Sequence, residues 1–276
     1  MSAKSMRIAA PAAARIGLGL FAALIALFLI FPIVIVVPLS FSGSEFLSFP
    51  PESWSLRWYE DFFGSSRWLD SAWLSIWIAV ISALLATVLG TAAALGLARA
   101  RFPGKGIVLA FLLSPLVVPA IIVSIGVYFF YAPLGLVGSP IGIAIAHAAL
   151  ASPFVLVNVA AALTGFDPRL EQAAKNLGAS GWATFRLVTF PIIKPGVMAG
   201  AVFAFIASFD EMIVAMFITS PGNTTLPIRM WESMRNEISP GIAAVSTLVI
   251  LLSVSLFFVA ARIQARAAAR AGGTPE

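Results

Sequence analysis

The chain has 276 residues, of which 60% are hydrophobic and only 11% carry a charged side chain. Soluble domains of this size carry roughly 25% charged residues, so the composition excludes a soluble protein and indicates an integral membrane protein. No cysteine is present, which excludes disulfides, thiolate metal sites and cysteine nucleophiles. The single histidine, His147, leaves little for zinc chemistry, and we expect no metal site. The net charge of +5 does not indicate nucleic-acid binding, because the basic residues are sorted by membrane side.

Six apolar stretches are each long enough to cross about 30 Å of hydrocarbon at 1.5 Å per residue. They predict an all-α membrane protein with six transmembrane helices and a single transmembrane domain covering residues 1–276. The first stretch lacks the short apolar core and cleavage site of a signal peptide, so we interpret it as an uncleaved span. Pro115 and Pro119 should kink the third span. The predicted spans are Gly17–Phe41, Ala72–Ala98, Gly106–Tyr131, Ile141–Leu163, Gly196–Thr219 and Ile242–Ala261.

The basic residues predict which side of the membrane each connection faces. Thirteen of the 17 Lys and Arg residues lie in the N-terminal tail Met1–Arg15, the segment after the second span, the connection Gly165–Pro195 and the C-terminal tail. The other four lie in the alternate connections. Because cytoplasmic loops carry the excess of Lys and Arg, we expect a multi-pass protein of the cell inner (cytoplasmic) membrane with both termini cytoplasmic.

The cytoplasmic connection Gly165–Pro195 predicts a short amphipathic helix. Asp167 is a suitable N-cap, Pro168 suits the first helical position, and Gly178 can end the helix in a left-handed conformation. Apolar residues recur at i, i+3, i+4 and i+7, which gives one apolar face with a flat alanine centre. These residues are Leu170, Ala173, Ala174 and Leu177.

A second short helix is predicted to start at Ser180 and to stop at Pro191. Amphipathic loops of membrane proteins often lie in the interface or pack on their own bundle. A helix with small residues on its outer face also suits a groove on a soluble partner. The pattern of residues leaves both interpretations open.

Small residues recur every four positions in two of the predicted spans, and such stripes let helices approach closely. For the first stripe, alanine-rich filler is an equally good interpretation. The stripes are Ser82, Ala86, Gly90 and Ala94 in the second span and Gly196, Gly200, Ala204 and Ser208 in the fifth.

Asp210 and Glu211 are the only acidic residues inside any predicted span. A charge there costs roughly 2.5–3.5 kcal/mol, so such residues generally face a cavity or a partner. Neighbouring helical positions differ by about 100°, so we expect only Glu211 near the fifth-span stripe, with Asp210 pointing away. At least one of them is expected to line a path for a cationic substrate; a structural hydrogen bond or ion pair is the alternative. His147 is interpreted as hydrogen-bonded packing, and Tyr128 as an interfacial residue that could contact substrate.

The sequence contains no catalytic or nucleotide-binding pattern. No glycine-rich phosphate loop is followed by Gly-Lys-Ser/Thr, so ATP binding by that route is excluded. Ser, His and Asp occur without a motif that would bring them together. We therefore expect that this chain is not an enzyme.

The connection Gly165–Pro195 also carries a family signature. Gln172-Ala173-Ala174, Gly178 and Val188-Thr189-Phe190-Pro191 closely match the EAA signature of ABC-importer permeases: Glu-Ala-Ala, three residues, Gly, nine residues, then Ile-x-Leu-Pro. Gln172, Val188 and Phe190 depart from it. Glu171 lies one place early and faces about 100° away around the helix, which puts a glutamate-mediated salt bridge to an ATPase in doubt.

A second segment resembles the spermidine/putrescine-type permeases of that family. In those proteins an acidic pair follows a Ser-hydrophobic step, and a Thr-x-Pro segment leads to a Leu-Pro. The matching residues here are Ser208-Phe209-Asp210-Glu211, Thr219-Ser220-Pro221 and Leu226-Pro227.

The resemblance implies a six-transmembrane-helix ABC-importer permease bundle with Gly165–Pro195 as its cytoplasmic coupling-helix loop. It implies these partners: a cytoplasmic ABC ATPase dimer, a second homologous permease subunit, and a periplasmic or lipid-anchored solute-binding protein, within membrane lipid and without nucleic acid. ATP and Mg²⁺ would be used by the ATPase, with no cofactor on this chain. The implied coupling residues are Glu171, Gln172, Ala173, Ala174, Gly178 and Pro191, and the substrate-path residues are Asp210, Glu211 and Tyr128.

The predicted function is that of an ATP-driven importer's permease, for polyamines or a similar small cationic solute. Another small solute is the first alternative. An ion-coupled secondary transporter, whose intramembrane acids bind the coupling ion, is the second, and an intramembrane enzyme the third. Neither of the last two gives a reason for the EAA signature.

Overall fold

The computed structural model describes residues 12–236 and 239–272, and within these ranges the chain forms helices and loops but no β-strand. The predicted all-α class is confirmed. The predicted N-terminal tail, with Lys4 and Arg7, lies outside the described residues except for its last four positions. The chain divides into two compact units, Met1–Asp61 with Glu237–Leu248 and Phe62–Asn236 with Val249–Glu276, which are described separately. The prediction of one transmembrane domain stays a prediction.

Five helices of the described residues are long and apolar enough to cross a membrane, or six spans if one sharply bent pair counts as one. This agrees with the six predicted spans in number and, apart from the fifth, in position. The five straight candidates are Ile16–Leu39, Ser66–Arg99, Pro140–Thr164, Gly181–Phe209 and Pro240–Arg266.

The bent pair is the predicted third span. Its halves, Lys105–Leu116 and Ala120–Leu134, meet at an angle of 101°. Pro115 lies in the short 3₁₀ segment that ends the first half, and Pro119 is the N-cap of the second. Proline lacks a backbone N–H and clashes with the preceding turn, so two of them four residues apart separate the halves. The predicted kink is confirmed, and it is larger than one proline in a continuous helix would give.

The first unit contains α1 (Ala12–Leu39), most of α2 (Arg57–Gly64) and the start of α12 (Pro240–Gly272). The loop after α1 folds back through one isolated β-bridge between Ser42 and Trp54. A hydrogen bond of 2.7 Å joins the hydroxyls of Ser40 and Tyr59. The Arg57 guanidinium lies 4.5 Å from the centre of the Trp58 ring. These contacts hold the connection after the first span in a defined conformation.

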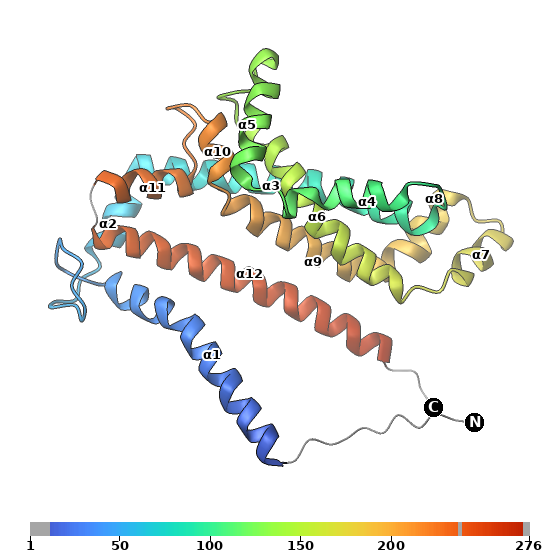
Figure 1. Cartoon of the computed structure of the whole chain (residues 1–276), viewed down its shortest axis with the longest axis horizontal. Coiled ribbons are helices and arrows are strands. Elements are labelled where there is room, and N and C mark those ends of the chain that lie inside the picture. Colours follow the sequence, from blue (N-terminus) through green and yellow to red (C-terminus); the bar gives the residue numbers. More distant parts are fainter. Residues whose placement is uncertain (1–11, 237–238, 273–276) are drawn as a thin grey trace. The chain divides into compact units, whose positions relative to one another are not determined.

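The core of the second unit is formed by three helices that pack side by side: α3 (Ser66–Arg99), α6 (Pro140–Thr164) and α9 (Phe190–Phe209) (Figure 1). A Cβ added at Gly90 of α3 would lie 2.7 Å from the Cβ of Val155 in α6. A Cβ added at Gly200 of α9 would lie 2.8 Å from the Cα of the same Val155. Only glycine permits both approaches, so the small-residue stripes are interfaces and not filler.

The fifth predicted span differs most from the structure. The helix does not stop at Pro191 but runs continuously through α8 (Gly181–Thr184), η3 (Phe185–Thr189) and α9. η3 is a π-helix, in which the Phe190 N–H donates to the Phe185 carbonyl five residues earlier. This wider turn, directly before Pro191, accommodates a proline that would otherwise clash with the preceding turn. The predicted separate short helix from Ser180 to Pro191 is therefore wrong.

The fifth predicted span also ends earlier than expected. α9 stops at Phe209, and after a break the short α10 (Ile213–Ile218) follows. The connection between the fifth and sixth predicted spans contains a further helix, α11 (Leu226–Asn236). The backbone N–H of Leu226 donates to the Ser75 hydroxyl of α3 over 2.7 Å, which fixes the start of α11 on the bundle.

We expect Gly200→Ala to lower the thermal unfolding midpoint of the purified chain in detergent. The new methyl group would press on backbone atoms of Val155, and overpacking of this kind costs about 1–3 kcal/mol. Gly126→Ala in α5 (Ala120–Tyr131) is the matched control, because nothing lies within 4 Å of its added Cβ. Equal midpoints for the two variants would contradict the close approach.

Candidate functional site

Two groups of predicted functional residues lie at opposite ends of the helical path Gly181–Phe209 (Figure 1). The helix α7 (Arg169–Asn176) precedes the start of this path, and the acidic pair Asp210–Glu211 follows its end. At 1.5 Å per residue the path is about 40 Å long, enough to cross a membrane.

The acidic pair does not lie inside a continuous helix, which corrects the sequence prediction. Asp210 is the C-cap of α9, and α10 begins only at Ile213. The two carboxylate oxygens of Glu211 accept hydrogen bonds of 3.0 and 3.1 Å from the backbone N–H groups of Val214 and Ala215. Glu211 thus satisfies donors that the interruption would leave free at the start of α10.

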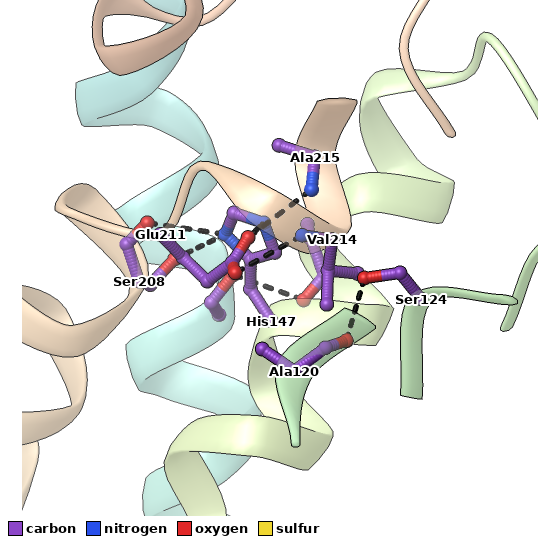
Figure 2. A network of polar contacts seen from close by, with 9 residues as sticks. Ala120, Ser124, His147, Ser208, Glu211, Val214 and Ala215 are labelled. Atoms are coloured by element: carbon purple, nitrogen blue, oxygen red, sulfur yellow. Dashed lines mark hydrogen bonds and ion pairs between the residues drawn. The ribbon is translucent and has the colours of Figure 1, made fainter. Parts of the chain in front are cut away.

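His147 of α6 connects the end of α9 to this break (Figure 2). Its ring is 1% exposed; Nδ1 lies 3.0 Å from the hydroxyl and 3.1 Å from the carbonyl of Ser208, and Nε2 lies 3.4 Å from Glu211 Oε2. The interpretation of His147 as hydrogen-bonded packing agrees with this geometry. Glu211, predicted for a substrate path, is engaged by His147 and by the backbone of α10.

Asp210 is in a different situation from its neighbour. Its side chain is exposed, and among the described residues its carboxylate makes no hydrogen bond or ion pair. The 100° separation expected for a helix does not apply at the break, and both acids line one cleft of about 450 Å³. Asp210 also borders a second cleft of about 350 Å³, here called the methionine cleft. The methionine cleft is lined by Phe209, Asp210, Met212, Leu226, Pro227, Met230, Trp231, Met234 and Val249.

The methionine cleft combines one carboxylate with two aromatic rings and three thioethers. A carboxylate and an aromatic face attract an ammonium group, while methionine side chains adapt to an aliphatic chain. The sequence analysis did not predict a cleft lined by α11. The signal for it is the i, i+3, i+4, i+7 pattern of a helical face at Pro227, Met230, Trp231 and Met234. Tyr128, the third predicted path residue, lies half exposed on α5 and lines neither cleft.

At the other end of the path, the predicted left-handed end of α7 at Gly178 is confirmed, whereas the N-cap is Pro168 and not the predicted Asp167. Asp167 Oδ1 accepts a 2.9 Å hydrogen bond from the Arg169 N–H. Gly178 has φ +86°, the left-handed value that favours glycine. The N–H groups of Gly178 and Ala179 donate to the carbonyls of Lys175 and Ala174, which is the Schellman pattern.

The outer surface of α7 is open. No residue of α7 is buried, and Leu177, directly after the helix, is 90% exposed. The predicted coupling residues Gln172, Ala173, Gly178 and Pro191 are exposed, and Ala174 is partly covered. Glu171 differs from them, because its side chain is 14% exposed and contacts Arg99 and Thr189 of the bundle.

Comparison with known proteins identifies the kind of protein that carries these features. Residues 86–269 match the family described as "Binding-protein-dependent transport system inner membrane component". The chain is 32% identical over 255 residues to the spermidine/putrescine transport system permease protein PotC of Shigella flexneri, covering 92% of this chain and 96% of that protein. It is also 32% identical over 247 residues to the putrescine transport system permease protein PotI of Escherichia coli (strain K12), covering 87% and 88%.

Among solved structures, the fold is similar to that of a bacterial ABC transporter involved in the import of the acidic polysaccharide alginate. The TM-score is 0.69 at 15% sequence identity, and the likeness covers 90% of this chain and 95% of that chain. The predicted ABC-importer permease fold is confirmed. The chain belongs to the family of binding-protein-dependent transport system inner membrane components, and it is a multi-pass permease subunit of an ABC importer.

Proposed function

We propose that this permease carries polyamines, short aliphatic chains with ammonium groups. The observation that carries the proposal is the position of Asp210, an exposed carboxylate without a partner among the described residues, on the rim of the methionine cleft. One relative is a permease of a spermidine/putrescine transport system and the other of a putrescine transport system, which supports the same substrate class.

The methionine cleft has lining residues suited to both the ammonium groups and the methylene chain of a polyamine. An ammonium group would pair with the Asp210 carboxylate and lie against the faces of Phe209 or Trp231. The methylene chain would pack on Met230 and Met234. Sites for organic molecules are in general mostly apolar with a few oriented polar groups, and this lining has that character.

Fold similarity does not identify the substrate, because a transporter involved in the import of an acidic polysaccharide has a similar fold. Charge does distinguish the two cases. Among the described residues, those that line the methionine cleft include a carboxylate and no Lys or Arg, so a polyanion would be repelled there. A small neutral solute remains the first alternative, and membership of an ABC-importer family disfavours an ion-coupled transporter.

We further propose that α7 docks on a cytoplasmic ABC ATPase dimer. Its exposed apolar residues, Leu170 and Leu177, together with Ala173, would enter a groove on that partner. ATP and Mg²⁺ would bind to the ATPase, a second homologous permease subunit would complete the bundle, and a periplasmic or lipid-anchored binding protein would deliver substrate. The positive-inside rule supports an orientation in which both termini and α7 face the cytoplasm. The methionine cleft would then lie toward the side from which substrate arrives.

We expect Asp210→Asn to reduce polyamine uptake at least tenfold at subsaturating concentration, because the ammonium group would lose its counter-charge. Loss of one charged hydrogen bond or ion pair in such a cleft corresponds to about 1.5–3 kcal/mol. Initial rates in cells or membrane vesicles would measure the effect, mainly as a raised KM. Asp70→Asn is the matched control, since Asp70 is an exposed acid on α3 that lines neither cleft.

Uptake by Asp210→Asn equal to that of Asp70→Asn would overturn the cation-binding role of Asp210. The transport class is tested separately in the same vesicles. Vanadate or ATP depletion should abolish uptake, whereas an ion-coupled transporter would continue to work on its ion gradient.

For α7 we expect Gly178→Val to impair both uptake and co-purification with the ATPase. A β-branched residue at φ +86° is strained by roughly 1–3 kcal/mol, which would distort the end of the helix. Gly178→Asn is the matched variant, because asparagine tolerates the left-handed conformation and should retain most of the activity. A Gly178→Val chain that binds its ATPase and transports normally would contradict the docking proposal.

A further inference from the structure

Three segments of the second unit meet at the Glu171 carboxylate. Glu171 lies in the first turn of α7, Arg99 is the last residue of α3, and Thr189 is the last residue of the π-helix η3. The Thr189 hydroxyl donates to Glu171 Oε1 over 2.6 Å, and Arg99 Nη2 donates to the same oxygen. Arg99 Nη2 also lies 3.4 Å from the Thr189 hydroxyl oxygen. One carboxylate oxygen thus joins α7 to the end of α3 and to Thr189 within the continuous helix Gly181–Phe209.

Two of the three side chains in this contact are shielded from water. Thr189 is fully buried and the Glu171 side chain is 14% exposed, while about half of the Arg99 side chain is exposed. Charged hydrogen bonds in such surroundings are stronger than those on an open surface, where water and salt compete. The contact should therefore persist while α7 itself remains accessible.

Apolar burial does not hold α7 in place, because none of its residues is buried. In the described part of the chain, Glu171 is the α7 side chain that makes polar contacts with the bundle. The position of α7 relative to α3 and η3 therefore depends on this carboxylate to a greater degree than on any other α7 side chain.

The hydroxyl of Thr189 is used differently from those of three other helical threonines in the described chain. Thr87, Thr184 and Thr247 each donate to the carbonyl four residues earlier in their own helix. Thr189 instead donates to Glu171 at the end of the π-turn. π-turns frequently mark functional positions, and this one directs a buried donor out of its own helix.

We propose that Arg99, Glu171 and Thr189 form a tether that positions α7 and carries its displacement into α3 and the η3–α9 helix. The inference rests on the proposed docking of α7 to an ATPase. The far ends of both helices reach the methionine cleft: Ser75 of α3 holds the start of α11, and α9 ends at Phe209 and Asp210. The three residues contact no substrate, so their role is one of positioning.

The tether is tested first on the purified full chain in detergent, without an ATPase. We expect Thr189→Val and Glu171→Ala each to increase amide hydrogen exchange at residues 172–178 at least tenfold, because α7 is released from the bundle. Thr184→Val is the matched control, since Thr184 is equally buried on the same segment but bonds to the Ser180 carbonyl. Arg101→Gln, at an exposed basic position near the end of α3, is the control for Arg99→Gln.

Unchanged exchange at residues 172–178 in both Thr189→Val and Glu171→Ala would overturn the tether. So would an equal increase in Thr184→Val, because that would indicate a general loosening of the segment. The exchanged pair Arg99→Glu with Glu171→Arg should restore more protection than either single variant, which a merely space-filling role would not produce.

The coupling role of the tether is tested in the complete importer, in which the permease is reconstituted in proteoliposomes with the ATPase and the binding protein. We expect Thr189→Val to retain ATP hydrolysis while the amount of substrate moved per ATP falls at least threefold. Thr184→Val should keep the original ratio. An unchanged ratio for Thr189→Val would overturn the transmission of displacement. Failure of the unaltered chain to assemble with any ATPase would overturn the proposed docking, while hydrogen exchange still decides whether the tether exists.

Discussion

The close approach of α3 and α9 to α6 at Val155 is the constraint on which the second unit depends. Gly90 and Gly200 bring two backbones against one valine from two different helices. In lipid no hydrophobic force drives helices together, so dispersion contacts of this kind must do so. This contact sets the distances between the three helices, and two features near their ends depend on those distances. They are the Arg99–Glu171–Thr189 tether and the break after Phe209.

The break after Phe209 shows how a membrane helix can be interrupted without leaving backbone groups unpaired. Glu211 accepts the donors at the start of α10, and His147 holds both Glu211 and the Ser208 backbone. Irregular backbone in a membrane protein is tolerated where protein groups satisfy it or where it lines a cavity, and both conditions apply to this break. Glu211 is held by these contacts, whereas the neighbouring Asp210 is the acid that we propose for the substrate. The two adjacent acids differ because their hydrogen-bond partners differ.

The sequence was sufficient to predict what depends on composition and local period: five of the six spans, the glycine stripes, and the end of α7 at Gly178. The sequence was insufficient where the structure depends on contacts between residues that are far apart in the chain. The helix passes through Pro191 by way of a π-turn, and the residues on either side of the break after Phe209 contact His147, which lies on another helix. The α11 face of the methionine cleft was visible as a helical pattern, but its pairing with Asp210 follows from tertiary structure.

The position of the acidic residue on α7 determines whether its carboxylate faces a partner or the membrane helices of this chain. The family signature places a glutamate where this chain has Gln172, and the carboxylate lies one residue earlier, at Glu171. One residue is about 100° of helix rotation, enough to turn a side chain from the exposed surface toward the bundle. Gln172 is indeed exposed, while Glu171 reaches Arg99 and Thr189. The outer face of α7 is thereby left with a neutral amide, which can still hydrogen-bond to a partner, and the charge strengthens the contact between α7 and its own membrane helices.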